Sequence, residues 1–316
     1  MTPPAPPKPL DPAAVDLSVR LGPLTLRNPV MVASGTFGYG PEYADLVNLE
    51  DLGAIVVKGI CLEPTRGNPT PRTCEVASGL INAIGLQNPG VAGFLRDYLP
   101  FLRRFSTPVI VNIWGHTVEE YAEVARRFSE AEGVAALEVN VSCPNIKEGS
   151  KLFGTDPDAF RRVLDAVRAA TRLPLMPKLA PNVSDIGVFA RAAEQCGADA
   201  ISLINSVPAM AVDPETRRPR LANVTGGLTG PAIRPIAVKL VWEAARATRL
   251  PIVGMGGILE AAHAVEFLLV GATAVAIGTA NFAEPRTARR VADGLRDYLA
   301  RHGLASPREL VGGLRL

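Results

Sequence analysis

Residues 108–141, PVIVNIWGHTVEEYAEVARRFSEAEGVAALEVNV, contain one complete strand–helix–strand unit. Pro108–Ile113 and Ala136–Val141 are short, almost wholly apolar and rich in β-branched residues, as strands buried on both faces are. Between them, Val118–Glu132 has apolar residues at the three- and four-residue spacing of an amphipathic helix. A strand, a covering helix and a second buried strand together predict a parallel sheet.

The same unit recurs along the whole chain. Besides the two strands already named, we expect strands at Pro29–Ala33, Ala54–Lys58, Leu173–Leu179, Ala200–Ile204, Pro251–Met255 and Thr273–Ile277. Further amphipathic helices are expected at Pro157–Thr171, Asp185–Cys196 and Leu259–Val270. Eight strands that each precede a helix predict the α/β class and a closed (β/α)8 TIM barrel, with an open doubly wound sheet as the alternative.

Three further features lie outside this repeat. Asp16–Arg20 and Leu24–Arg27 flank the turn Leu21-Gly22-Pro23 and predict an N-terminal hairpin that plugs the bottom of the barrel. Gly59–Pro89 and Asn205–Pro231 are long connections that leave from the carboxyl ends of predicted strands. Barrel enzymes keep their chemistry at that end, and long loops there are usually lids or binding loops, so we expect the active site there.

The composition is that of an ordered chain of enzyme size. It has 316 residues, 47% of them hydrophobic and 20% charged, so it can bury a sizeable core. Its net charge of +2 gives no electrostatic reason to expect nucleic acid or an anionic membrane as a partner. We expect Met1–Pro12 to be a disordered Pro-rich tail and residues 13–316 to form one domain, in the cytoplasm because no signal peptide is seen.

The four cysteines, Cys61, Cys74, Cys143 and Cys196, form no CxxC pair and predict neither a zinc site nor an iron–sulfur cluster held by this chain alone. Cys143 stands apart from the others because it directly follows a predicted strand, within Asn140–Asn145. Its thiolate could act as a base or a nucleophile toward a ligand over the barrel mouth. An inert loop cysteine, or a Cys–His hydrolase that uses His116 of the same rim, is the alternative.

Five predicted strands end in polar residues on this rim. These residues are Lys58, Asn112, Asn140, Lys178 and Asn205. Each could satisfy a strand end by itself, but five on one rim favour a binding site. Strand alternation also places Glu138 on the inward face with Asn140, where Lys178 of the next strand is the cation that could pair with it.

Glycine-rich turns end the last two predicted strands. The seventh strand ends in Gly254–Gly257, and the eighth ends in Gly278-Thr279-Ala280. These two positions form the usual phosphate site of such barrels, because backbone N–H groups face the anion there. We therefore expect a phosphorylated ligand. The GxGxxG fingerprint of dinucleotide-binding folds is not satisfied, so direct NAD binding is not expected.

Several motifs together resemble the class 1 dihydroorotate dehydrogenases. They are Gly67–Arg72 (GNPTPR), Asn82–Asn88 (NAIGLQN), Asn140–Asn145 (NVSCPN), Asn223–Gly230 (NVTGGLTG) and the Gly254–Gly257 turn, in the family's order. The resemblance runs from about Leu17 to the C-terminus, and Ile146–Ser150 is more similar to subtype 1B than to the fumarate-using 1A. It implies oxidation of (S)-dihydroorotate to orotate in pyrimidine biosynthesis, on FMN bound by a TIM barrel spanning residues 13–316.

The resemblance also assigns roles to individual residues. Cys143 would remove the C5 proton of dihydroorotate while a hydride passes from C6 to the flavin. The substrate would be held by Lys58, Asn82, Ala83, Ile84, Gly85, Leu86, Asn140, Asn205 and Ser206. FMN would be contacted by Ser34, Lys58, Gly59, Asn112, Asn140, Lys178, Ile204 and Gly230, with its phosphate on Gly256, Gly257, Gly278 and Thr279.

Subtype 1B implies partners as well. We expect a homodimer, and a second subunit carrying FAD and an iron–sulfur cluster that passes electrons to NAD. A membrane-bound class 2 enzyme is not expected, since neither a membrane-associating segment nor a serine base is seen. Three alternatives stay open: the pyrimidine-reducing domain of a dihydropyrimidine dehydrogenase, a Schiff-base lyase using Lys58 or Lys178, and a catalytically silent assembly subunit.

Overall fold

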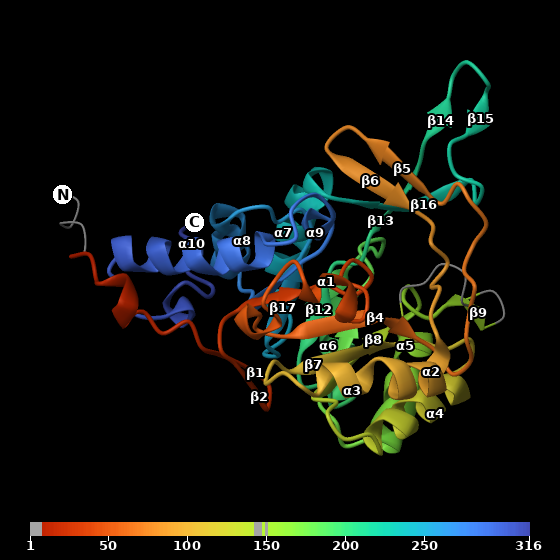
Figure 1. Cartoon of the computed structure of the whole chain (residues 1–316), viewed down its shortest axis with the longest axis horizontal. Coiled ribbons are helices and arrows are strands. Elements are labelled where there is room, and N and C mark those ends of the chain that lie inside the picture. The colour runs from red at the N-terminus through yellow and green to blue at the C-terminus, as the bar shows by residue number, and fades with distance from the viewer. Residues whose placement is uncertain (1–7, 142–146, 149–150) are drawn as a thin grey trace.

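The computed structural model describes residues 8–141, 147–148 and 151–316 (Figure 1). Eight parallel strands close into a barrel in the order β11-β12-β17-β18-β3-β4-β7-β8. Their bounds are β3 Val30–Val32, β4 Ile55–Ile60, β7 Val109–Ile113, β8 Ala136–Asn140, β11 Leu175–Lys178, β12 Ile201–Leu203, β17 Ile252–Met255 and β18 Ala274–Ile277. Each predicted strand therefore exists. The (β/α)8 barrel is confirmed, and the open doubly wound sheet is excluded.

Helices surround the barrel. The longer ones are α2 Gly90–Asp97, α4 Val118–Ser129, α5 Pro157–Ala170, α6 Ile186–Gln195, α7 Arg234–Ala245, α8 Ala261–Leu269 and α10 Thr287–Arg301. Short helices are α1 Pro41–Ala44, α3 Leu99–Leu102 and α9 Ala280–Ala283, with 3-10 turns η1 Pro12–Ala14, η2 Leu49–Asp51, η3 Pro231–Ile233 and η4 Pro307–Glu309. Side chains of Thr117, Asp156 and Asp185 cap α4, α5 and α6 by accepting hydrogen bonds from backbone N–H groups of the first turn.

The barrel wall separates two apolar cores, which explains why its strands are apolar on both faces. Val56, Ile110 and Met176 point inward and belong to the core that fills the barrel. Their neighbours Val57 and Val111 point outward and pack in the larger core beneath the helices. Successive strand residues alternate between these cores, so only the top of the inward face is left for polar side chains.

The N-terminal hairpin closes the bottom of the barrel, as predicted. Strand β1 (Val19–Leu21) pairs antiparallel with β2 (Leu24–Leu26). Val19, Leu21 and Leu26 belong to the same core as the inward-facing barrel residues. The turn between the strands needs a glycine, because Gly22 has a φ of +59° and a Cβ would lie 2.8 Å from the carbonyl oxygen of Asp199.

The two long connections do more than loop over the barrel. They pair into one antiparallel sheet in the order β13-β16-β6-β5, from β5 Thr73–Val76, β6 Gly79–Asn82, β13 Val207–Met210 and β16 Thr225–Thr229. A further pair, β14 Val212–Asp213 and β15 Arg218–Pro219, projects away from the barrel (Figure 1). Strands β9 Lys147–Glu148 and β10 Lys151–Leu152 form another short antiparallel pair. The sequence predicted both long connections, but it did not predict that their strands pair in one sheet.

The N-terminal segment runs along α10. The backbone N–H of Leu10 donates to the carbonyl oxygen of Ala300 at 2.9 Å. The domain boundary after Pro12 stays a prediction, and residues 1–7 lie outside the described part of the chain. No helix of the described residues is both long and apolar enough to cross a bilayer.

Candidate functional site at the carboxyl end of the barrel

A fully buried carboxylate, Glu138, lies under the rim of the barrel. Alternation along β8 turns its side chain inward, as predicted, and its exposure is 0%. Oε1 accepts a hydrogen bond from Ser202 Oγ at 2.8 Å. Oε2 accepts from Ser34 Oγ at 3.0 Å and from Asn112 Nδ2 at 2.5 Å. One carboxylate thus gathers side chains from three other parts of the barrel wall.

Lys178 completes this cluster. Its Nζ lies 3.7 Å from Glu138 Oε2 and donates to Ser34 Oγ at 3.1 Å, so the predicted ion pair is confirmed. Lys178 is 5% exposed, and a buried pair of charges persists only with good geometry and further hydrogen bonds, which Ser34 and Asn112 supply. Ser202 was not among the predicted site residues. Its inward position on the predicted strand 200–204 was the available signal.

Lys58 lies on β4, between β3, which Ser34 follows, and β7, which carries Asn112. It was predicted to end its strand, but β4 continues to Ile60, and its register with β7 shifts between Val57 and Ile60, as at a β-bulge. Burial lowers the pKa of the half-buried Lys58 ammonium, the nearby Arg72 lowers it further, and Glu42 partly opposes both. An anionic ligand would offset this cost, which agrees with the role predicted for Lys58.

The predicted substrate loop, Asn82–Leu86, begins where β6 ends. Asn82 Nδ2 donates to the carbonyl oxygen of Gly227 on β16, at 3.2 Å, which links the loop to the second long connection. Gly85 has a φ of +77°, and a Cβ there would meet the backbone nitrogen of Asn68 at 2.5 Å. The loop is therefore packed tightly against the Gly67–Arg72 motif.

The amide of Asn88 connects this loop to the strand that carries Lys58. Its Nδ2 donates to the carbonyl oxygen of Leu86 at 2.8 Å and to Thr65 Oγ1 at 2.6 Å. Its Oδ1 accepts from the backbone N–H of Cys61 at 3.3 Å, three residues after Lys58. One side chain thus bonds to both the predicted substrate loop and the residue that follows β4, the strand of Lys58.

The remaining predicted substrate residues meet beside Lys178. Lys178 and Asn140 are register partners on β11 and β8. Asn205 Nδ2 donates to Asn140 Oδ1 at 3.4 Å, and the backbone N–H of Ser206 donates to Asn205 Oδ1 at 2.8 Å. Ile204 lies between β12 and Asn205 in the sequence, and its side chain is buried. This group continues the rim from Lys178 toward the second long connection.

The two predicted phosphate turns follow adjacent strands, β17 and β18. Gly256 and Gly257 have φ values of +131° and +70°, and a Cβ on Gly257 would lie 2.8 Å from the carbonyl oxygen of Gly230. By contrast, a Cβ on Gly278 would meet nothing closer than 3.9 Å, and Thr279 leads into α9. Close-packed glycines beside an open glycine face suit a phosphate bound by backbone N–H groups.

Four buried side-chain polar atoms have no hydrogen-bond partner among the described residues: Tyr39 Oη, Asn112 Oδ1, Trp114 Nε1 and Asn281 Oδ1. Two of them, the acceptor Asn112 Oδ1 and the donor Trp114 Nε1, lie close to the same residue, Gly59. Gly59 lies between them, since a Cβ built on it would be 2.7 Å from Asn112 Oδ1 and 3.6 Å from Trp114 Nε1. Buried polar atoms are normally paired, so the rim fits a ligand whose ring offers both an acceptor and a donor.

Cys143 lies outside the described residues, and its sequence neighbour Val141 directly follows β8 at this rim. Of the other cysteines, Cys61 and Cys74 are buried. Burial and the neighbouring Asp165 raise the pKa of Cys196 to about 11, so this thiol is a poor source of thiolate. The described residues contain no group of three His, Cys, Asp or Glu side chains able to hold a metal ion.

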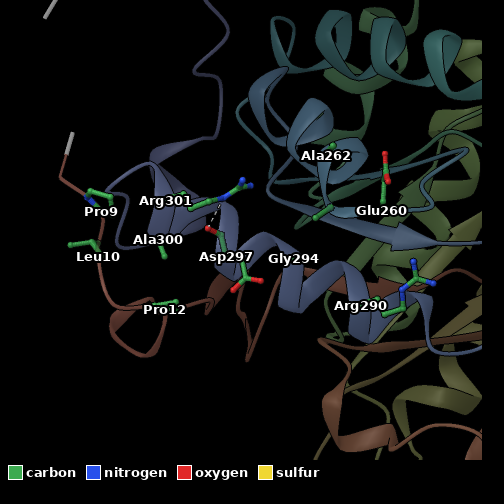
Figure 2. A pocket seen from close by; sticks show the side chains of 11 residues that line it. Pro9, Leu10, Pro12, Glu260, Ala262, Arg290, Gly294, Asp297, Ala300 and Arg301 are labelled. Carbon is green, nitrogen blue, oxygen red and sulfur yellow. Dashed lines mark hydrogen bonds between the residues drawn. The ribbon is translucent and has the colours of Figure 1, made fainter. Parts of the chain in front are cut away.

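A separate surface groove lies between the N-terminal segment and α8 and α10 (Figure 2). It has a volume of about 660 Å³ and is lined by Pro9, Leu10, Pro12, Glu260, Ala261, Ala262, Arg290, Gly294, Asp297, Ala300 and Arg301. Its charges are of both signs, and Arg301 Nε donates to the carbonyl oxygen of Asp297 at 3.4 Å. None of the predicted site residues line it, so this groove is distinct from the candidate site.

Comparison with known proteins places the chain among close relatives. The family model described as dihydroorotate dehydrogenase matches residues 16–299. A protein of Geotalea daltonii is 53% identical over 304 residues, which cover 96% of this chain and 100% of that protein. A protein of Geobacter sulfurreducens is 54% identical over 301 residues, covering 95% and 99%. Both relatives are named dihydroorotate dehydrogenase B (NAD(+)), catalytic subunit.

Proposed function

Because this chain belongs to the dihydroorotate dehydrogenase family, we propose that it oxidises (S)-dihydroorotate to orotate as the catalytic subunit of a B-type enzyme. The observation that carries the proposal is the convergence of Lys58, Lys178 and the phosphate turns at one end of the barrel, in a chain more than half identical to such subunits. A silent barrel would need neither the glycine turns nor the asparagine rim, and a Schiff-base lyase would not need the asparagine rim.

The cofactor of the proposal is FMN. Gly256, Gly257, Gly278 and Thr279 would hold its phosphate, and Ser34, Lys58, Gly59, Asn112, Asn140, Lys178, Ile204 and Gly230 would surround its ring and ribityl chain. The orphaned Asn112 Oδ1 fits the N–H of an isoalloxazine ring. When bound, FMN accepts the hydride that leaves C6 of dihydroorotate.

Lys178 would supply fixed positive charge beside the ring. Its ammonium is held by Glu138 and by Ser34 Oγ, so it does not need to reorient when negative charge develops. Preorganised charge in a site that excludes water stabilises a transition state more than a mobile side chain does. Glu138 acts through Lys178 and is therefore a positioning residue.

The substrate would bind between Lys58 and the loop Asn82–Leu86. The ammonium of Lys58 would take the carboxylate, and amides of Asn82, Asn140 and Asn205 would meet the alternating donors and acceptors of the ring. Cys143 Sγ would accept the C5 proton. That C–H is only weakly acidic, so the base must be positioned against it, and a thiol with an ordinary pKa of about 8.5 should work better as pH rises.

The proposal includes the partners and the setting. Electrons would leave for NAD through a second subunit carrying FAD and an iron–sulfur cluster, because the four cysteines of this chain offer no cluster motif. The functional unit would be a homodimer of one-domain chains with that subunit, working in the cytoplasm.

The test is a spectrum of the purified chain, taken without oxygen. We expect a yellow protein whose band near ~450 nm, the usual flavin absorption, bleaches when dihydroorotate is added. Cys143→Ser should stay yellow and fail to bleach at neutral pH, because a serine hydroxyl has a far higher pKa than a thiol and is not ionised there. Cys196→Ser is the matched control, because it makes the same substitution at the partly buried thiol that follows α6, and this variant should bleach normally.

The outcomes separate the parts of the proposal. A colourless protein that cannot take up FMN contradicts the cofactor and the reaction together. A yellow protein that ignores dihydroorotate but bleaches with dihydrouracil would instead assign it to the dihydropyrimidine dehydrogenase type of substrate. Bleaching that survives in Cys143→Ser would remove Cys143 from its role and leave the reaction in place.

A further inference from the structure

Trp114 is a buried residue at the rim that none of the predicted roles includes. It follows β7 directly and is 3% exposed. Its backbone N–H donates to the carbonyl oxygen of Ile60 at 3.0 Å, and its ring packs edge-on against His116, with centroids 4.9 Å apart. The indole is therefore fixed in orientation while its N–H has no partner among the described residues.

Asn112 presents an acceptor close to this donor. The orientation of its amide follows from chemistry: Glu138 and Ser34 lie next to one end, and an ionised carboxylate only accepts hydrogen bonds, so Nδ2 faces Glu138. Oδ1 must then face Gly59. A single point, the Cβ position of Gly59, lies 2.7 Å from that oxygen and 3.6 Å from Trp114 Nε1.

We propose that Trp114 Nε1 and Asn112 Oδ1 form a donor–acceptor pair that recognises the imide edge of a pyrimidine-type ring. Such an edge presents a carbonyl oxygen beside an N–H, which is the complement of this pair. The inference rests on the proposed function, because that function brings two such edges to this rim: one in the flavin ring and one in orotate. Trp114 is then a specificity-determining residue of the site.

Asn112 alone would not distinguish an imide from other N–H groups. The added donor requires a carbonyl oxygen at a fixed offset, and a site built to hydrogen-bond a ligand rejects analogues that leave its buried groups unpaired. Gly59 contributes by having no side chain, since a Cβ at that position would occupy the space before the pair.

The test replaces the donor and keeps the aromatic ring. Trp114→Phe should bind one of the two ligands about 10-fold more weakly, as expected for a lost buried hydrogen bond. FMN is titrated onto the apoprotein, and orotate onto the FMN-loaded protein, by flavin absorbance. The thermal midpoint of the apoprotein is measured alongside, because the smaller ring also leaves a cavity in the packed core. Trp242→Phe is the control, since Trp242 lies on α7 under Arg246 and away from the rim.

Each outcome bears on the proposal. Weaker FMN binding assigns the pair to the flavin, and weaker orotate binding with unchanged FMN affinity assigns it to the substrate. Unchanged affinity for both ligands overturns the proposal, whether or not the apoprotein is destabilised, because a packing role would move only stability. Failure of the unaltered chain to bind either ligand would instead refute the proposed function.

A second measurement does not depend on how the variant folds. The chain has two tryptophans, so ¹⁵N labelling gives two indole resonances, and Trp242→Phe assigns them. The Trp114 indole N–H should shift on addition of FMN or orotate and become protected from exchange, while that of Trp242 stays in place. A Trp114 resonance that neither ligand affects overturns the pairing.

Discussion

Glu138 is a carboxylate with no exposed surface, and it is tolerated because both of its oxygens accept hydrogen bonds. Ser202, Ser34 and Asn112 donate to it, and Lys178 supplies the opposite charge. Removing one member of a buried ion pair leaves the other uncompensated, which costs more than the pair itself contributes. The cluster should therefore respond to a single substitution much more strongly than its hydrogen-bond count suggests.

We expect Glu138→Gln to lower the free energy of unfolding by about 3–5 kcal/mol, because it leaves the Lys178 ammonium buried without its counter-ion. Denaturant unfolding of the apoprotein measures this. Glu243→Gln is the control: its partner Lys239 lies one helical turn away on the exposed face of α7, and such pairs contribute about 0.5 kcal/mol or less. The double variant Glu138→Gln with Lys178→Met removes the unpaired ammonium and should recover part of the lost stability. If it is no more stable than Glu138→Gln alone, the lost ion pair does not cause the destabilisation.

Lys58 predicts a pH dependence. Burial and Arg72 hold its pKa below the ordinary 10.5, so between the lowered value and 10.5 the unfolded chain binds more protons than the folded chain. The unfolding free energy should therefore rise with pH across that window. Ligand affinity should do the opposite, because a carboxylate needs the charged ammonium: the affinity for orotate should fall by up to about tenfold per pH unit above the lowered pKa.

The measurement is the dissociation constant of orotate from the FMN-loaded protein between neutral pH and 10.5. Lys58→Arg serves as the reference, because a guanidinium stays charged over this pH range. Its affinity for orotate should therefore show no fall with pH, whatever the absolute affinity of the variant. An identical pH profile in the two proteins would mean that another group, or orotate itself, titrates.

At the scale of elements, the turn after β17 is held in shape by crowding as well as by backbone conformation. Gly257→Ala places a Cβ 2.8 Å from the carbonyl oxygen of Gly230 at a φ of +70°. Gly312 offers a matched comparison: its φ is +72°, but a Cβ there would meet nothing within 4 Å. Both substitutions impose the left-handed strain of about 1 kcal/mol. Only Gly257→Ala must also move the turn.

We therefore expect Gly257→Ala to weaken FMN binding by at least about tenfold, since backbone N–H groups aimed at a phosphate lose their geometry when the turn shifts. Gly312→Ala should lower the thermal midpoint slightly and leave FMN affinity unchanged. Titration of FMN onto each apoprotein measures both. Equal affinities in the two variants would exclude this turn from the phosphate site.

How far the sequence predicts the structure depends on the distance between the interacting parts. Alternation within a strand correctly turned Glu138 inward, and adjacency of two strands correctly paired it with Lys178, because both follow from local periodicity. The pairing of Asn82 with Gly227 could not be predicted in the same way. These residues are far apart in the chain, their strands are short, and no local pattern specifies which edges meet.

The same limit applies to the candidate site. Lys58, Asn112 and Asn140 could be predicted, because the change from apolar to polar residues at the end of a strand is seen directly in the sequence. Trp114 gave no such signal, because an apolar residue after an apolar strand reads as core. Only its unpaired N–H, seen in three dimensions, distinguishes it.

At the scale of the whole molecule, the barrel and the added sheet have different roles. The barrel wall fixes Ser34, Asn112 and Lys178 around Glu138, on a rigid frame filled inside and outside by apolar side chains. The sheet of β5, β6, β13 and β16 stands over the rim and carries the start of the predicted substrate loop (Figure 1). Binding sites built between a rigid frame and a separate layer can admit and release ligands without disturbing the frame.

In the proposed function, this chain oxidises dihydroorotate and passes electrons to NAD only through a second subunit. The sequence lacks a GxGxxG fingerprint, and its cysteines offer no cluster motif through which electrons could travel. We therefore expect the purified chain with dihydroorotate to reduce an artificial dye rapidly and NAD at least about 100-fold more slowly. Addition of a subunit carrying FAD and an iron–sulfur cluster should raise the NAD rate and leave the dye rate unchanged. Fast NAD reduction by the chain alone would show that the nicotinamide reaches the flavin directly, and the proposed partner would then have no role in electron transfer.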